Sequence, residues 1–275
     1  MTDAVSEHWR RGDLLTAMED ALARAGYDPG TPTLDQLTQV DQLHGRGLDA
    51  TRELLEPLNV GAEDHVLDIG CGIGGPARWL AATTGCRVTG IDLTDEFIAV
   101  AAEWTQRLGL VDKVTVQVGD ATDLPFADAA FDAAYTHNVS MNVPDKRAFF
   151  AEALRVLKPG GRFAAAEVAQ GPGGAAILPA PWADAPGTSH LATTEETVAL
   201  LEDVGFVVDR VTDGTEKAIQ FIADNRRRLE TEGPPFLGPH VLIGPSAKEK
   251  MRNVALNIKE RRTLPVEFFC HRPGN

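Results

Sequence analysis

The chain has 275 residues, 43% of them hydrophobic, so it is long enough to bury a full core and fits one large domain with an elaboration. Its formal net charge of −14 repels nucleic acid backbones and anionic lipid headgroups, so we expect neither a nucleic acid nor a membrane as a partner. The three cysteines show no paired spacing, and the first residues contain no apolar stretch that could act as a signal. These features favour a reduced protein in the cytoplasm, either a monomer or a homodimer.

Two helices are predicted before the first strand. Apolar residues recur at helical spacing from 14 to 22, Asp13 can cap this helix, and Gly26 is well placed to end it. A second amphipathic stretch covers residues 48–58. The polar, glycine-broken segment between the two helices predicts a loop.

From Val66 onward, short apolar runs alternate with helical segments. The predicted strands are VLDIG, RVTGID, KVTVQV, FDAAYT and GRFAAAEV, and helices are predicted between them at 75–84, 94–108 and 145–158. A further helix begins at Thr193, which stands at capping-box spacing from Glu196, and the strand FVVDRV follows it. Apolar strands that are each followed by a helix indicate an α/β fold with a doubly wound, mostly parallel sheet, which we expect to have seven strands.

Two segments interrupt this alternation. Residues 171–190 are too rich in Pro and Gly for regular structure, and residues 215–262 predict two amphipathic helices around the break GPPFLGPH. Long insertions after strand ends often carry substrate-binding parts, so we expect both segments to form a lid. The expected parts of the chain are the N-terminal helices 1–60, the core 61–214 with the lid loop 171–190, the helical lid 215–262, and 263–275, which returns as an edge strand of the core sheet.

The most informative segment is the run from Val66 to Gly75, in which a buried strand leads directly into a glycine loop and a helix. Only glycine lets the backbone turn this tightly and lets a ligand lie against the main chain. The spacing of Gly70, Gly72 and Gly75 also satisfies the dinucleotide fingerprint, in which backbone amides hold a pyrophosphate at the helix start. An NAD(P)-dependent oxidoreductase is therefore one possible interpretation.

Two carboxylates help to separate the candidate ligands. Asp68 lies two residues before Gly70, where it would repel a phosphate but attract the ammonium and sulfonium of S-adenosylmethionine (SAM). Asp92 lies 22 residues beyond Gly70, where a carboxylate can accept both hydroxyls of an adenosine ribose. Both ligands contain that ribose, so Asp92 does not distinguish them. Its alternative role is that of a simple helix-entry residue, with Thr94 as the cap.

The chain resembles the class I SAM-dependent methyltransferases in four separated signatures that span about residues 66–167. They are VLDIGCGIGG, the acidic strand end at Asp92, the segment GDATDLPF, and the run from FDAAYTHNVSMNVPD to LKPGGR. The N-terminal DQLHGRGLDATRELLE is similar to the segment by which sarcosine/dimethylglycine and phosphoethanolamine N-methyltransferases close over the SAM methionine. The tail from GPHVLIGP resembles small-molecule methyltransferases of the sarcosine/dimethylglycine type.

The resemblance implies SAM as the cofactor and identifies the residues that would bind it. They are Gln42, Arg46, Asp68, Gly70, Cys71, Gly72, Gly74, Asp92, Leu93, Asp120, Ala121, His137 and Asn138. Asp68 and the glycines would hold the aminoacyl end, and Asp92 the ribose. Asp120 and Ala121 would meet the adenine, while His137 and Asn138 would line the methionine. The usual paired glycine is replaced by Gly45-Arg46-Gly47, so Arg46 either clamps the SAM carboxylate or is a solvated loop residue.

Methyl transfer from a sulfonium depends mainly on alignment in a dry pocket, and it needs a base only if the acceptor must lose a proton. The candidate catalytic residues are His137, at a strand end facing the cofactor, and Glu167, which we expect to end the fifth strand. Glu167 is either a base with a raised pKa or a rim residue in water, and His137 is either a ligand contact or a packing histidine. His44, His190 and His240 are further candidates for a base.

The acceptor pocket is expected in the lid. The aromatic residues Trp182, Phe221 and Phe236 either wall that pocket or form the lid core, while Trp79 and Trp104 are expected to be structural. Residues 215–272 hold 11 Lys and Arg against 7 Asp and Glu, which indicates either an anionic acceptor or a solvated helix face. No metal is expected, because the spacing offers no ligand set beyond a possible meeting of His240 and His271.

The sequence as a whole predicts a SAM-dependent methyltransferase of a small molecule. The flanking resemblance slightly favours an amine over an oxygen or carbon acceptor. The two alternatives are the NAD(P)-dependent oxidoreductase and a SAM-binding protein without catalysis.

Overall fold

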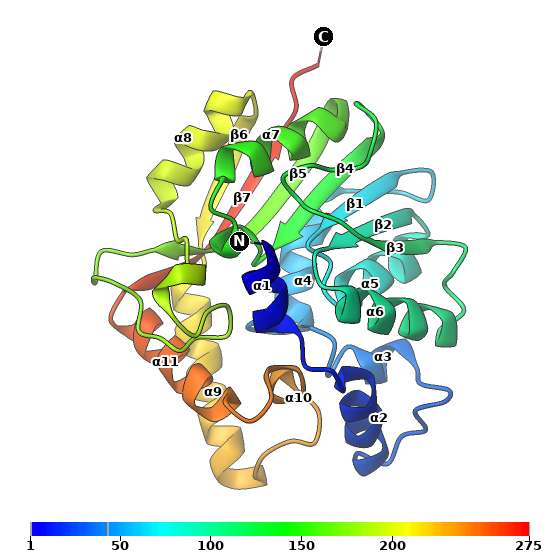
Figure 1. Ribbon diagram of the computed structural model, residues 1–275, viewed down its shortest axis with the longest axis vertical. Helices are drawn as coiled ribbons and strands as arrows, with labels where there is room; N and C mark the ends of the chain where they lie inside the picture. The colour runs from blue at the N-terminus through cyan, green and yellow to red at the C-terminus, as the bar shows by residue number, and fades with distance from the viewer. Residues whose placement is uncertain (1, 43, 275) are drawn as a thin grey trace.

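The computed structural model describes residues 2–42 and 44–274 and contains a seven-stranded sheet (Figure 1). The strands are β1 (His65–Ile69), β2 (Arg87–Asp92), β3 (Val114–Val118), β4 (Phe131–His137), β5 (Leu157–Gln170), β6 (Val207–Asp213) and β7 (Thr263–His271). Their order across the sheet is β3-β2-β1-β4-β5-β7-β6. Strands β1 to β5 pair in parallel and β7 is antiparallel to both of its neighbours. The predicted doubly wound, mostly parallel sheet is confirmed.

The position of β7 corrects one expectation. The tail does not return at an edge, because β7 lies between β5 and β6; it pairs with β5 along its whole length and with β6 from Val266 to His271. Val266, Phe268 and Cys270 of β7 point into the core on one face of the sheet, and Phe269 points into the core on the other. Most residues of β7 are buried, whereas those of β6 are mostly exposed, so β7 is stabilised more by two neighbours than by one and β6 takes the edge instead.

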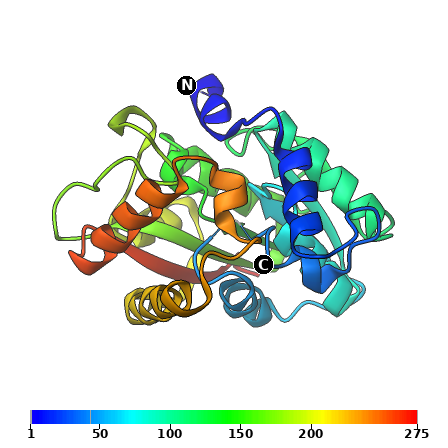
Figure 2. The same cartoon turned by 90° about the horizontal axis from the view of Figure 1, so that it is seen from below.

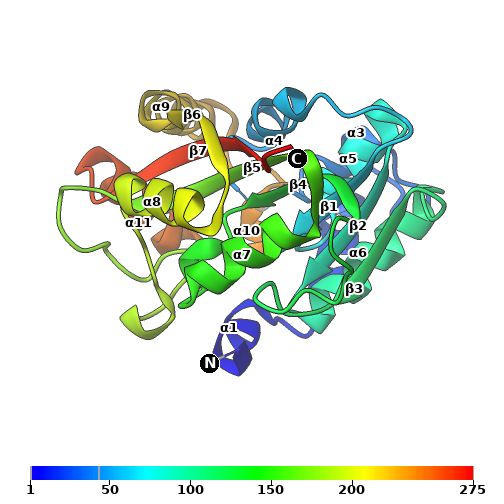
Figure 3. The same cartoon turned by 90° about the horizontal axis from the view of Figure 1, so that it is seen from above.

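Helices cover both faces of the sheet. The helices of the described residues are α1 (Thr2–Trp9), α2 (Leu14–Arg24), α3 (Leu34–Leu37), α4 (Leu48–Leu55), α5 (Gly75–Thr84), α6 (Asp95–Arg107), α7 (Lys146–Val156), α8 (Thr194–Val204), α9 (Thr215–Glu232), α10 (Pro239–Ile243) and α11 (Ala247–Lys259). Helices α7 and α8 cover one face, and α4 and α5 cover the other, where α9 lies beside α4 (Figure 3). Among the described residues, none of the helices has the length and apolar character needed to cross a bilayer.

The N-terminal helices dock on α6. The carboxylate of Glu96 in α6 accepts the backbone N–H groups of Arg11 and Leu14, at 2.6 and 3.0 Å, and so satisfies the start of α2. Asp13, the predicted cap, makes no side-chain hydrogen bond to the helix. The expectation that Asp13 caps α2 was wrong, because the Glu96 carboxylate of the neighbouring helix α6 accepts these N–H groups instead of the Asp13 carboxylate.

The segment 171–190 is ordered by side chains from three other parts of the chain. The Asn142 amide of η2 (Ser140–Asn142) donates to the carbonyl oxygen of Trp182 at 2.8 Å, and Asn253 of α11 donates to that of Pro179 at 2.9 Å. His8 of α1 contacts the carbonyl oxygen of Pro181 at 2.8 Å. Viewed from below, α10 lies between α2 and α11 (Figure 2).

Candidate active site

The glycine loop after β1 is closely packed on two sides. A side chain at Gly70, where φ is +77°, would place its Cβ atom 2.2 Å from the Val139 side chain. A Cβ atom at Gly75, the first residue of α5, would lie 2.4 Å from the carbonyl oxygen of Asp41. The loop is therefore held between the segment that follows β4 and the N-terminal segment, and glycine is required at both contacts.

Asp92 ends β2 and ties the glycine loop to the next helix. Its Oδ2 accepts the backbone N–H of Gly72 and its Oδ1 accepts that of Thr94, both at 2.9 Å. Thr94 makes no side-chain cap, so the capping role expected for it was wrong. Leu93, between them, is half-buried. Burial raises the pKa of the Asp92 carboxyl. Each carboxylate oxygen keeps a lone pair with which it could accept a ribose hydroxyl.

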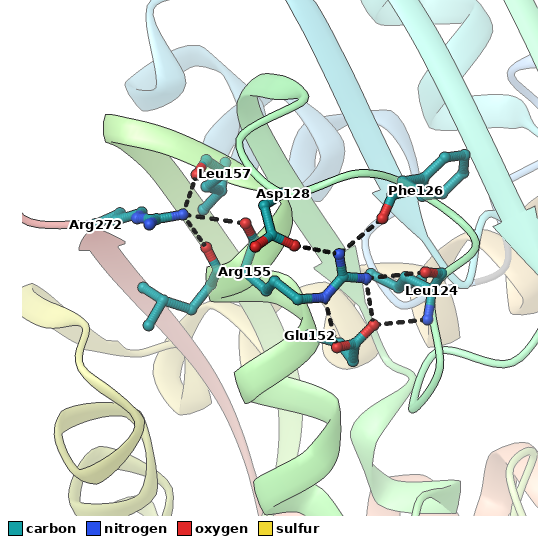
Figure 4. Close-up of polar contacts among 8 residues, drawn as sticks. Leu124, Phe126, Asp128, Glu152, Arg155, Leu157 and Arg272 are labelled. Atoms are coloured by element: carbon teal, nitrogen blue, oxygen red, sulfur yellow. Dashed lines mark hydrogen bonds and ion pairs between the residues drawn. The ribbon is translucent and has the colours of Figure 1, made fainter.

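The predicted adenine segment is anchored from α7 (Figure 4). Arg155 donates to the carbonyl oxygens of Leu124 and Phe126, at 2.9 and 2.7 Å, and pairs with Asp128 and Glu152. Glu152 in turn accepts the backbone N–H of Leu124 at 2.8 Å. The sequence analysis missed Glu152 and Arg155, although their i, i+3 spacing on a predicted helix was a visible signal.

Asp120 and Ala121 stand at the start of this anchored segment, directly after β3, and both are half-buried. Asp120 Oδ1 accepts both the backbone N–H and the hydroxyl of Thr122, at 2.8 and 2.7 Å. These bonds fix the carboxylate at the same sheet edge as Asp92. The adenine contacts of Asp120 and Ala121 stay a prediction, which their place just beyond the end of β3, beside the end of β2, supports.

Asp68 is a buried carboxyl group one residue before the end of β1. Its Oδ2 accepts the hydroxyl of Tyr135 in β4 at 2.7 Å. Burial raises the pKa of Asp68 to about 7, with a further contribution from the neighbouring Asp92. A cation bound beside Asp68 would favour its ionised form. Tyr135, which the sequence analysis missed, could not be recognised because it reads as one more apolar strand residue.

His137, the last residue of β4, meets a second histidine from the N-terminal segment. The rings of His137 and His44 lie 3.5 Å apart, centroid to centroid, with an interplanar angle of 55°. Burial lowers the pKa of both imidazoles, to about 3 for His44, and the Arg46 charge acts in the same direction. The buried Nδ1 of His137 has no hydrogen-bond partner among the described residues. Asn138 follows with φ of +58° and donates its backbone N–H to Ala166.

The other predicted cofactor residues lie around this pair and the loop. Gln42 is buried and hydrogen bonds through its side chain to Asp41 and Thr51. Arg46 pairs with Glu53 of α4 and is largely buried, so it is not a solvated loop residue. Cys71 is buried, with its Sγ 3.7 Å from the Gly72 carbonyl oxygen. Gly74 caps α5 in the left-handed conformation.

Glu167 corrects two expectations. Strand β5 continues three residues beyond it to Gln170, and the Glu167 side chain is only 4% exposed, so it is not a rim residue in water. Its Oε1 accepts the Ser140 backbone N–H at 3.4 Å, and burial raises its pKa to about 7. His137 pairs in register with Ala166, so strand alternation puts Glu167 on the opposite face of the sheet. The structure does not bring the two candidate catalytic residues together.

The lid aromatics differ in exposure. Trp182 is 4% exposed, packs with Met141, and donates its indole N–H to Ser189 at 3.0 Å. Phe236 is 60% exposed and Phe221 is half-buried. Trp104 is fully buried, and Trp79 of α5 packs in the same core cluster as α4. His190 donates its backbone N–H to Met141, and His271 contacts Asp209, while His240 lies exposed on α10.

The cations of the C-terminal part largely have acidic partners. Lys217 pairs with Glu53, Lys250 with Asp184, and Arg262 with Glu260. Arg226, Arg227 and Arg228 of α9 pair with acids on the same helix. The pairs within residues 215–272 leave the local excess of four positive charges unchanged, but Glu53, Asp184 and Asp213, which faces Arg261, lie outside this segment and offset three of the four.

Comparison with known proteins identifies the family. Residues 67–165 match the family model described as "Methyltransferase domain". The chain is 37% identical to methyltransferase GfsG of Streptomyces halstedii over 57% of this chain and 54% of that protein, so it spans about half of the length of GfsG. It is 29% identical to O-methyltransferase cnsE of Penicillium expansum over 96% and 89% of the two chains. An O-methyltransferase of Pyrenophora dematioidea is 30% identical over 77% of this chain and 78% of its own.

Solved structures share the fold. Geranyl diphosphate C-methyltransferase of Streptomyces coelicolor A3(2) superimposes with a TM-score of 0.72 at 18% identity, over 98% of this chain and 97% of its own. Phosphoethanolamine N-methyltransferase 2 of Haemonchus contortus gives a TM-score of 0.73 at 21% identity, over 95% and 57% of the two chains. Because the family match covers β1 to β5 and the Pyrenophora relative extends it over most of the chain, the protein belongs to the class I SAM-dependent methyltransferases.

Proposed function

We propose that this protein transfers the methyl group of SAM to a hydroxyl oxygen of a small molecule. The observation that carries the proposal is the half-buried imidazole of His137, which ends β4 beside the glycine loop and whose pKa burial lowers, so that it is uncharged at neutral pH. Its Nδ1 is buried without a partner in the described part of the chain, so Nε2 is the nitrogen that would take a proton from the acceptor. An amine can attack as its free base, whereas a hydroxyl must lose a proton, so a base at this position favours a hydroxyl over an amine.

The residues of the sheet edge fit SAM. Asp92 would hold the ribose, Asp120 and Ala121 the adenine, and Asp68 with the glycine loop the aminoacyl end. A phosphate-bearing dinucleotide fits less well, because Asp68 and Asp92 both lie beside the loop that would have to hold the pyrophosphate. When bound, SAM supplies a methyl group on a positively charged sulfur, which leaves as a neutral thioether.

The chain's own residues would then bind and orient the acceptor and remove its proton. His137 takes the hydroxyl proton at the end of β4, and Trp182 and Met141 form part of an apolar wall that excludes water. Glu167 is the second candidate base. Its burial beneath the Ser140 backbone and its place on the other face of the sheet favour a role in holding the loop after β4.

The names of two relatives support an oxygen acceptor. Two relatives that share more than three quarters of their own length with this chain are called O-methyltransferases. Since the cations of residues 215–272 are mostly paired, we propose an uncharged acceptor. The rate with a matched anionic analogue should then be similar to the rate with the neutral acceptor, at both low and high ionic strength. A preference for the anionic analogue that fades with salt would instead support attraction by the lid cations.

The test is a methyl-labelled SAM assay, read by mass spectrometry, with matched phenol and aniline acceptors of the same ring. We expect label on the phenol oxygen, and His137→Gln should lower kcat for the phenol by roughly a hundredfold. Labelling of the aniline alone, with His137→Gln fully active, would overturn the proposal. Calorimetry with SAM and with NADH tests the oxidoreductase alternative, and SAM binding without turnover on any acceptor would support the non-catalytic one.

A further inference from the structure

Helix α1 lies between α6 and the lid loop, in front of the central strands (Figures 1 and 2). Its last residue, Trp9, is half-buried and packs against two separate apolar clusters. The first cluster contains Ile73 of the glycine loop and Phe97 of α6, and the ring centroids of Trp9 and Phe97 are 6.1 Å apart. The second contains Met141 and Trp182. Trp9 therefore connects the cofactor side of the sheet edge with the lid.

The C-terminal end of α1 is anchored on α6. Arg10, which follows the helix directly, pairs with Asp95 at 2.7 Å. The next residue, Arg11, donates its backbone N–H to Glu96 at 2.6 Å. These bonds join α1 to α6 without the lid loop, so this end of the helix can stay in place when the contact with the lid is broken.

His8, the residue before Trp9, joins α1 to the lid loop. Its side chain is 7% exposed, its Nε2 donates to the carbonyl oxygen of Pro181 at 2.8 Å, and its Nδ1 lies 3.2 Å from Asp184 Oδ2. Asp184 Oδ1 accepts from the Nζ of Lys250 in α11 at 2.9 Å, and the Lys250 side chain is also 7% exposed. One carboxylate of the lid loop is thus the acidic partner of two largely buried side chains, one from α1 and one from α11.

The exposure of Trp9 separates it from the packing tryptophans. Trp104 is fully buried within one cluster, whereas Trp9 stays half-buried between two. Trp9 and Trp182 are also the aromatic members of the cluster that contains Met141. Aromatic side chains make stacked or edge-to-face contacts with other rings, so two indoles beside one pocket favour a flat, ring-containing acceptor.

We propose that Trp9 lines the acceptor pocket and that the contacts of His8 with Pro181 and Asp184 hold α1 closed over it. In the closed position Trp9 limits the size of the acceptor. When the His8 contacts break, α1 moves away from the lid on its α6 anchor, and the pocket opens for the acceptor to enter and the product to leave. Trp9 is then a specificity-determining residue, and His8 and Asp184 are positioning residues. The inference rests on the proposed function, in which Met141 and Trp182 form part of the pocket wall.

The proposal predicts how acceptor binding depends on the contact. If only the closed form holds the acceptor tightly, the apparent affinity falls in proportion to the fraction of molecules in which α1 is closed. A variant that weakens the His8 contacts should therefore raise KM for the acceptor. It should leave kcat nearly unchanged, because a saturating acceptor restores the closed form.

Three variants test the contact. His8→Phe keeps a ring but removes both nitrogens, and Asp184→Asn keeps the side-chain shape but removes the charge. Asp184 is 65% exposed, so Asp184→Asn keeps the test open if His8→Phe does not fold. Glu7→Gln changes an exposed carboxylate on the same helix and is the matched control. The measurements are hydrogen exchange of residues 4–9, the SAM dissociation constant, and kcat and KM with phenol and 1-naphthol.

His8→Phe and Asp184→Asn should each raise KM for phenol about threefold to tenfold, with kcat and the SAM dissociation constant within about twofold of the wild type. Hydrogen exchange in α1 should become faster in both variants, and Glu7→Gln should match the wild type throughout. Unchanged exchange and KM in both variants, or an effect on SAM affinity alone, would overturn the role of the His8 contacts.

A fourth variant, Trp9→Leu, tests the pocket wall. The smaller side chain leaves room for a second ring, so kcat/KM for 1-naphthol should rise about fivefold relative to phenol. A wild-type ratio of the two would show that Trp9 does not line the pocket. The same ratio is measured with 1-naphthylamine and aniline. If the label goes to these amines and Trp9→Leu shifts their ratio, the proposed oxygen acceptor fails while the assignment of Trp9 survives.

Discussion

Asp92 Oδ2 accepts the backbone N–H of Gly72 at 2.9 Å, which joins the residue expected to bind the ribose to the loop expected to bind the aminoacyl end. Asp92→Ala should therefore lose roughly 2–4 kcal/mol of SAM binding free energy, because the charge-assisted hydrogen bonds to the ribose disappear and the loop loses its hydrogen bond to Asp92. Isothermal titration calorimetry measures the loss. Asp95→Ala, which removes an exposed carboxylate three residues away, is the control and should bind SAM normally.

Gly72→Val should abolish SAM binding, because a β-branched side chain is strained at φ of +53° and fills the space where the ligand would lie. Gly109→Val separates strain from contact, since Gly109 has φ of +66° and an added Cβ atom there meets nothing within 4 Å. Both variants should lose similar stability in urea, but only Gly72→Val should lose SAM affinity. Equal affinity in the two variants would mean that the loop does not contact the ligand.

Arg155→Met should weaken SAM binding although Arg155 is not expected to touch the ligand. It removes the bonds that hold the backbone of Leu124 and Phe126, and the free energy of unfolding should fall by about 2 kcal/mol after allowance for partial solvent exposure. We expect a threefold to tenfold higher SAM dissociation constant, since the adenine segment becomes less ordered. Arg147→Met, on an exposed turn of the same helix, should change neither quantity.

Glu167→Gln should change how stability depends on pH. Burial raises the Glu167 pKa from 4.5 to about 7, so the folded state keeps the proton that the unfolded state releases. The stabilisation from protonated Glu167 is complete below pH 4.5 and is lost as pH rises through 7. Relative to Glu167→Gln, the wild type should lose about 3 kcal/mol of unfolding free energy over that interval. Urea denaturation at several pH values tests this, and a constant difference would contradict the buried carboxyl.

Trp182→Phe should change the choice of acceptor while leaving SAM affinity within about twofold, because Trp182 packs in the lid cluster with Met141 and not beside Asp92. The lost packing and indole hydrogen bond should lower the unfolding free energy by roughly 2 kcal/mol. Phe236→Ala is the contrasting variant, since Phe236 is mostly in solvent. The measurement is the relative rate on each member of a panel of phenols. If both variants ranked the phenols as the wild type does, Trp182 would not be part of the acceptor pocket.

The amino-acid sequence by itself determined the sheet architecture and the glycine loop with its acidic strand ends. These features depend on short-range patterns: an apolar strand that leads into Gly70 and Gly72, a carboxylate at the end of the next strand, and helices between strands. Their chemistry is local, because a tight turn needs glycine and a helix repeats every few residues. The α5 boundaries at 75 and 84 and the Thr193 capping box agree with the structure for the same reason.

Only the tertiary structure decided which distant side chains meet. β7 lies inside the sheet because most of its residues are buried, whereas those of β6 are mostly exposed. Glu167 is buried because β5 continues beyond it, and His44 meets His137 although 93 positions separate them. Arg155 holds a loop that lies about 30 residues earlier in the chain. Contacts of this kind depend on strand order, on which face a side chain occupies and on what covers it, and no local pattern in the sequence carries that information.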